Sequence, residues 1–173
     1  MSIITPEIEY VDRSMESIRY LEHGWPSDLC RWHSHREFEL HLIVATRGKA
    51  FVGDYIGEFR PGSLFLTGPY LPHNWVTDEI TSRHVSTRDM LVQFDQESVN
   101  SLSLAFPEFD DMRPMFELAC SGIEFSGFDA KLVQRRLAEI RNSSGPSRIL
   151  AFLQLLVEIN QHAEMRQLSV AAV

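Results

Sequence analysis

Three imidazoles and two carboxylates fall at alternate positions in one short stretch of the chain. They are His33, His35, Glu37, Glu39 and His41. Because alternate side chains of an extended strand share a face, these groups could project one way while the intervening apolar residues project the other. Neutral imidazoles and a carboxylate that converge suit a borderline divalent cation such as Zn, Ni, Mn or Fe(II). The pattern predicts either a metal site or the solvated polar face of a strand.

The spacing His33-x-His35-x-x-x-Glu39 supplies the candidate metal ligands within this stretch. Glu37 and His41 are further ligand-binding candidates, because they share the ligands' face if the strand is unbroken. A bulge or a turn after His35 would reverse that arrangement. Whether Glu37 and His41 belong to the site therefore depends on whether the strand continues past His35.

Composition is typical of a folded globular protein. With 173 residues, of which 44% are hydrophobic, the chain can hold one domain, or one domain with a small appendage. A formal net charge of −8 argues against direct, non-specific binding to a phosphate backbone. No signal-peptide pattern and no apolar run as long as a membrane span occurs, so we expect a cytoplasmic protein without a membrane partner.

The two cysteines, Cys30 and Cys120, lie far apart and form no Cys-x-x-Cys unit. This arrangement is typical of free thiols in a reducing compartment. Cys30 lies close to the histidine stretch, where it would be either a soft fifth ligand or an inert buried thiol.

Short runs of β type follow one another at near-regular spacing in the first half of the chain. We expect strands at 17–22, 38–46, 50–59, 64–67, 72–76 and 89–94, a loop at 23–28, a hairpin at 47–49, and turns at 60–63 and 68–69. Short strands separated by Gly and Pro favour a sandwich or a barrel over βαβ units.

The second half has helical character, so the chain divides into a β part, 1–96, and a helical part, 97–173. Short helices are expected at 97–106 and 107–120, and Ser126 with Asp129 resembles a capping box for a third helix. That helix would bury Ala130, Val133, Leu137 and Ile140. A last helix from Pro146 presents Ile149, Leu153, Leu156 and Asn160, and its wide apolar sector would pack on the barrel or on a twin subunit. Residues 169–173 look like a frayed end.

With both parts in view, the chain resembles the cupin superfamily. The first cupin motif, His-x-His followed by Glu, would be His33, His35 and Glu39, and the second, Pro-x-Gly followed by His, would be Pro61-Gly62 and His73. The second motif departs from the general pattern, because Gly62 follows Pro61 directly and His73 comes late. With this departure, the second motif is similar to that of AraC-type transcriptional regulators. Residues 33–54 and 122–127 also resemble that family.

The resemblance implies a mostly β fold: an antiparallel cupin-type β-barrel (double-stranded β-helix or jelly roll) followed by a C-terminal helical segment. It also implies that His73 completes a metal set of three histidines and Glu39, or that the same polar interior forms a ligand pocket without metal. Trp32 and Trp75 flank the motifs and could stack on a sugar or a ring-shaped effector, or could be core residues.

The function that the resemblance implies is that of an effector-sensing and dimerisation domain. It would bind a small molecule, form a homodimer through the C-terminal helices, and reach DNA only through a helix-turn-helix domain, for which no sequence remains after Leu168. No residue is then catalytic. The alternative is a metal-dependent cupin enzyme, an isomerase or a dioxygenase, in which the same site is catalytic. A third possibility is a purely structural dimerisation module without an accessible pocket.

Overall fold

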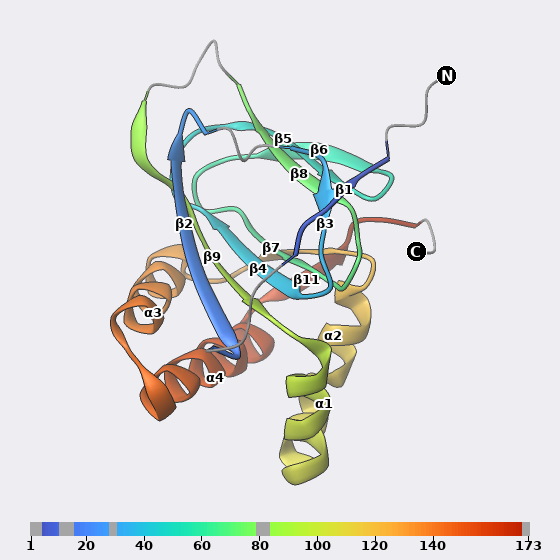
Figure 1. The fold of residues 1–173 in the computed structure, drawn as a ribbon, viewed down its shortest axis with the longest axis vertical. Coiled ribbons are helices and arrows are strands. Elements are labelled where there is room, and N and C mark those ends of the chain that lie inside the picture. Colours follow the sequence, from blue (N-terminus) through green and yellow to red (C-terminus); the bar gives the residue numbers. More distant parts are fainter. Residues whose placement is uncertain (1–4, 11–15, 28–30, 79–83, 171–173) are drawn as a thin grey trace.

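A computed structural model describes residues 5–10, 16–27, 31–78 and 84–170 (Figure 1). The strands are β1 (Glu7–Ile8), β2 (Ile18–Trp25), β3 (His33–Ser34), β4 (Phe38–Ile43), β5 (Gly48–Val52), β6 (Tyr55–Phe59), β7 (Leu64–Thr67), β8 (His73–Thr77), β9 (Val85–Phe94), β10 (Ile123–Ser126) and β11 (Glu164–Gln167). The helices are α1 (Gln96–Ala105), the 3-10 helix η1 (Pro107–Met112), α2 (Arg113–Ala119), α3 (Ala130–Asn142) and α4 (Gly145–His162).

The strands form two mainly antiparallel sheets, with orders β1-β3-β8-β5-β6 and β11-β10-β7-β4-β9-β2. In Figure 1 the helices gather at the end of the molecule away from β5, β6 and β8. The expected succession of short strands followed by helices is therefore confirmed.

Strand β4 is buried on both faces, and its alternation places the site. Phe38, Leu40 and Leu42 belong to a core that the six-stranded sheet forms with the helices, which contribute Leu137 and Phe152. Ile43 belongs to a second core, on the other face of the sheet, with residues of β5, β6 and β8. Because side chains alternate along a strand, Glu39 and His41 share the Ile43 face and lie between the sheets.

The hairpin expected at 47–49 is wrong. Strand β4 pairs with β7 and β9, whereas β5 pairs with β6 and β8, so the chain crosses between sheets at this point. The strand expected over 50–59 is instead a hairpin, in which Val52 opposes Tyr55 across a two-residue turn. Gly53 in that turn has a φ of +56°, which glycine adopts without strain.

Two short strands were missed in the helical part, because neither has enough residues to show a clear period. Strand β10 pairs with both β7 and β11, so this segment adds two strands to the six-stranded sheet. Ser126 ends β10, and the capping-box expectation is therefore wrong. Asp129 itself is the N-cap of α3 and accepts a hydrogen bond from the backbone N–H of Lys131.

Helix α3 buries Val133, Leu137 and Ile140 as expected, whereas Ala130 is half-buried. The face expected for α4 is confirmed in part: Leu156 is buried and Leu153 packs half-buried against the core, but Ile149 lies at the surface. The helix instead turns Phe152, Leu155 and Ile159 inward.

The chain end is also more ordered than expected, since Ser169 is fully buried and donates a hydrogen bond to Asp54. Residues 171–173 and Cys30 lie outside the described residues. Cys120 is a free thiol. Among the helices that the structure describes, none is long and apolar enough to cross a membrane.

The contribution of α3 to the core can be measured by removing one methylene group from a buried side chain of this helix. Ile140 is fully buried against the six-stranded sheet. We expect Ile140→Val to lower the free energy of unfolding by about 0.5–1.5 kcal/mol, because the lost group leaves a small void. Ile56→Val is the matched control, since Ile56 is 63% exposed. Urea denaturation measures both, and equal effects would contradict the described packing of α3.

Candidate metal centre

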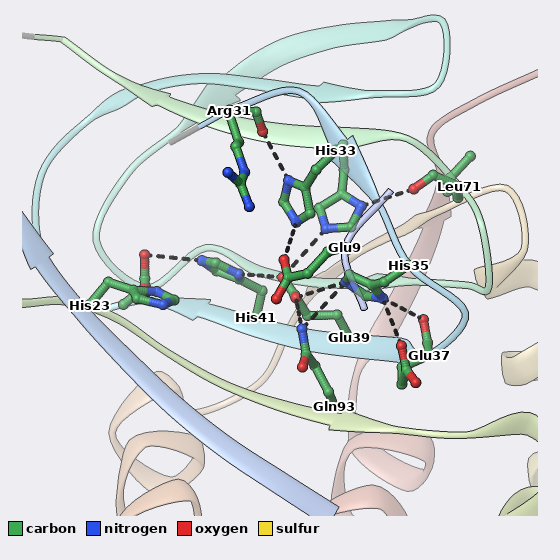
Figure 2. A network of polar contacts seen from close by, with 12 residues as sticks. Glu9, His23, Arg31, His33, His35, Glu37, Glu39, His41, Leu71 and Gln93 are labelled. Atoms are coloured by element: carbon green, nitrogen blue, oxygen red, sulfur yellow. Dashed lines mark hydrogen bonds and ion pairs between the residues drawn. The ribbon is translucent and has the colours of Figure 1, made fainter. Parts of the chain in front are cut away.

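Four polar side chains from three segments meet between the two sheets. His33 lies on β3, His35 follows it and Glu39 lies on β4 (Figure 2). His73 begins β8. One ligand atom of each lies within 4.8 Å of the others, and His35, Glu39 and His73 are buried. His33 and His73 are direct partners in the sheet, and their ring centroids are 4.4 Å apart. The structure thus brings together the four ligand candidates named from the sequence.

The stretch that carries three of these residues is not one strand. Strand β3 ends at Ser34 in the five-stranded sheet, and β4 begins at Phe38 in the six-stranded sheet. The break lies after His35, where a reversal of side-chain direction was one expectation. Because the two sheets face each other across the site, the β3 segment brings His33 and His35 toward Glu39 from the opposite sheet.

A shared hydrogen-bond pattern fixes the orientation of the three imidazoles. Their Nδ1 atoms lie 2.9, 3.1 and 2.9 Å from the backbone carbonyls of Arg31, Glu37 and Leu71, respectively. A carbonyl oxygen only accepts hydrogen bonds, so each Nδ1 must be the donor. In a neutral ring the Nε2 atom then carries the lone pair, which is the arrangement typical of a metal-bound histidine.

The Nε2 atoms face the carboxylate of Glu39. His35 Nε2 lies 3.2 Å from Oε2, and His73 Nε2 lies 3.6 Å from Oε1. His73 Nε2 is buried and has no hydrogen-bond partner within the described part of the chain. Lone pairs that face a carboxylate are unfavourable unless a proton or a cation lies between them. These residues therefore fit a divalent metal ion.

Burial and neighbouring charges together set the pKa values of these residues. Burial alone would raise the pKa of Glu39, but hydrogen bonds from His35 and His41 and the electrostatic effect of His73 hold it well below its ordinary value, so the carboxylate is ionised. Burial lowers the pKa of His33, and the charge of His73 adds to this effect. Burial opposes protonation of His35 as well, but the hydrogen bond and charge of Glu39 outweigh it and raise the pKa.

Both oxygens of Glu39 are held by neighbours outside the group. His41 Nδ1 donates to Oε1 at 2.8 Å, and the amide of Gln93 donates to Oε2 at 3.0 Å. His41 Nε2 faces Asp89, 3.3 Å from Oδ2. Burial opposes protonation of His41, but Asp89 and Glu39 raise its pKa to about 9. His41 therefore acts as a charged bridge between two buried carboxylates, which positions Glu39, and it also lines the cavity in which a ligand contact is predicted.

Asp89 contacts several charged or polar side chains around the metal group. It is fully buried, accepts a hydrogen bond from Arg88 Nε at 2.6 Å, and lies 2.9 Å from His23 Nδ1. Sequence reasoning did not single out these residues. The only signal was the occurrence of Asp89 and Gln93 in an otherwise apolar segment that was expected to form a strand, 89–94.

A cavity of about 190 Å³ adjoins the metal group. Glu9, Arg19 and Arg31 line it together with apolar Leu21, Leu91 and Trp75. It reaches the metal group at His33 and Glu39, and His41 also lines it.

The remaining candidates from the sequence take different places. Trp75 is 4% exposed, stacks on Phe65 with ring centroids 4.5 Å apart, and lines the cavity. Trp32 is half-buried and is not among the residues that line this cavity. Glu37 is fully buried, and neither carboxylate oxygen has a hydrogen-bond partner among the described residues. Its Oε2 atom lies 3.7 Å from His35 Nδ1.

Comparison with known proteins gives no relative: no family model matches the chain, and no curated protein matches its sequence.

Proposed function

We propose that this chain is the effector-sensing and dimerisation domain of an AraC-type transcriptional regulator, with a cupin-type barrel that binds a small molecule beside a metal ion. The observation that carries the proposal is the convergence of His33, His35, Glu39 and His73 next to a polar-lined cavity. The sequence resemblance supports the AraC assignment. The donor set, three imidazoles and one carboxylate, suits Zn, Ni, Mn or Fe(II).

A metal ion in this group would orient an effector. Residues of the chain itself would then couple effector binding to the helices. Strand β4 presents Glu39 to the site and Phe38 to the helical core. Phe38 stacks on Phe94, and Phe94 contacts Phe152 of α4 with ring centroids 4.8 Å apart. An effector that favours one position of β4 would bias the position of α4 through these rings, provided that it binds the two arrangements with different affinity.

A homodimer through the helices is part of the proposal. Leu150 on α4 is 68% exposed, and Leu104 and Phe106 at the end of α1 are 88% and 56% exposed. Large exposed apolar side chains of this kind on the helices are the surface that a protein contact would cover. DNA would be reached through a separate helix-turn-helix domain, since a chain with a net charge of −8 is poorly suited to hold a phosphate backbone itself.

The dimer predicts the behaviour of a charged variant. We expect Leu150→Glu to weaken self-association at least about tenfold, because a carboxylate would be desolvated in the interface. Light scattering after size exclusion, over a series of concentrations, measures the change. Ile56→Glu, which places the same charge at an exposed position on β6, is the control. A monomeric wild-type chain, or equal effects of the two variants, would contradict the dimer.

The function is tested by attaching residues 1–173 to a DNA-binding domain that represses a reporter only as a dimer. For metal-loaded protein, compounds that raise the melting temperature would be collected from a metabolite panel, and each would then be added to the reporter strain. We expect at least one to change repression while being recovered unchanged from the purified protein. Consumption of the compound, or oxygen uptake with Fe(II), would instead favour the isomerase or dioxygenase.

A further inference from the structure

A divalent ion held by the metal group would leave an unbalanced charge on the side that faces the cavity. A divalent ion with one carboxylate and neutral imidazoles keeps a net positive charge, and a buried charge is costly unless a counter-ion lies close to it. The buried carboxylate of Glu37 lies on the His35 side of the group, 3.7 Å from His35 Nδ1. Only His33 and Glu39 of the four ligand candidates line the cavity, so an anion from solvent has to approach on their side.

The chain places a carboxylate of its own at this position. The backbone N–H of Glu9 donates to the carbonyl of Ser34, which holds the segment beside β3. The Glu9 carboxylate then lies 3.8 Å from His33 Nε2 and 3.8 Å from an Arg19 nitrogen (Figure 2). Both distances are too long for hydrogen bonds. The Glu9 side chain is also 29% exposed, so it can give way to a better-placed anion.

We propose that the cavity side of the metal group is a carboxylate-binding position, which Glu9 occupies in this structure and which a small carboxylic acid takes when it binds. This inference rests on the proposed function, because the acid would be the effector. Arg19 and Arg31 line the cavity and add positive charge at the side chains nearest to solvent.

The other residues that line the cavity indicate the size and polarity of the part of the acid that carries the carboxylate. Leu21, Leu91 and Trp75 offer apolar surface. The volume of about 190 Å³ is slightly larger than a cavity of roughly 150 Å³ that holds benzene. The ligand class is therefore a monocarboxylic acid with a compact apolar or aromatic body, and benzoate is a suitable probe.

The test is calorimetric titration of the Zn(II)-loaded protein with benzoate, with its neutral isostere benzamide, and with glucose. We expect saturable binding of benzoate and at least about tenfold weaker binding of benzamide, because hydrogen bonds to charged groups are the stronger ones. Equal affinities for benzoate and benzamide, or no binding of benzoate, would overturn the inference. Saturable binding of glucose alone would overturn it too but would leave effector sensing standing. Chemical conversion of bound benzoate would support the carboxylate position and contradict the sensor function.

Two variants isolate the role of Glu9. Glu9→Gln removes the internal competitor, so benzoate affinity should rise about three- to tenfold, in line with the loss of one charged neighbour. Glu58→Gln is the matched control, since Glu58 lies on β6, has 86% of its side chain exposed and does not line the cavity. It should change the affinity less than about twofold. Unchanged or lower benzoate affinity in Glu9→Gln would contradict the proposal.

Discussion

Replacing His73 by alanine is expected to abolish stoichiometric binding of a divalent transition metal. Loss of an outer partner of a metal ligand typically lowers affinity about 10- to 100-fold, and loss of a ligand itself should exceed that. His73 is fully buried and contacts both the ring of His33 and the carboxylate of Glu39. Removing it takes away one of only three imidazoles in the group. Competition titration with a chromophoric chelator measures the change in Kd.

Controls separate metal loss from unfolding. His162→Ala removes an exposed imidazole at the end of α4 and should leave metal affinity unchanged. His33→Ala removes a ligand candidate that has 12% of its side chain exposed, so it disturbs the core less than His73→Ala does. If His33→Ala and His73→Ala both fold, as judged by circular dichroism, and both retain wild-type metal affinity, the described set is not the metal site.

Asp89→Asn is expected to cost about 3–5 kcal/mol of stability, which is typical when one partner is removed from a buried ion pair. Asp89 is fully buried, and its carboxylate is the shared partner of Arg88, His23 and His41. The amide keeps the shape but loses the charge that balances these cations. Urea denaturation at neutral pH measures the difference, and Asp110→Asn is the matched control. Asp110 pairs with Arg113 at the surface, where such a pair contributes at most about 1 kcal/mol.

The same carboxylate predicts an acid dependence. Burial would raise the pKa of Asp89, but the neighbouring charges of His41 and Arg88 and hydrogen bonds from His23 and His41 hold it far below its ordinary value. Its stabilisation is therefore complete above the ordinary Asp pKa of about 4 and is lost progressively as the pH falls below that value. Stability curves of wild type and Asp89→Asn should converge on acidification, and a constant gap between them down to low pH would contradict the network.

The spacing of residues in the sequence predicted the structural features that depend only on residues close together in the chain. The alternation in β4 placed Glu39 and His41 on one face and Leu40 on the other, because the period of a strand is fixed by its backbone. The helical spacing of Val133, Leu137 and Ile140 likewise predicted the buried face of α3. His73 was found only through the resemblance of its surroundings to a known motif.

What the sequence did not predict depends on pairing between distant strands. Gln93 and Asp89 reach the site because β9 pairs with β4, and Glu9 reaches it because β1 pairs with β3. No spacing rule links these residues to His33 or Glu39. The expected hairpin at 47–49 was wrong for the same reason, since turn residues show where a strand ends but not which strand is its neighbour.

The most direct test is X-ray absorption at the zinc K-edge, recorded on protein loaded with one equivalent of Zn(II). We predict multiple-scattering features of three imidazoles together with oxygen from Glu39, and loss of one imidazole contribution in His73→Ala if zinc is retained at all. A spectrum of the hydrated ion, or a coordination shell that His73→Ala leaves unchanged, would contradict the metal centre formed by His33, His35, Glu39 and His73.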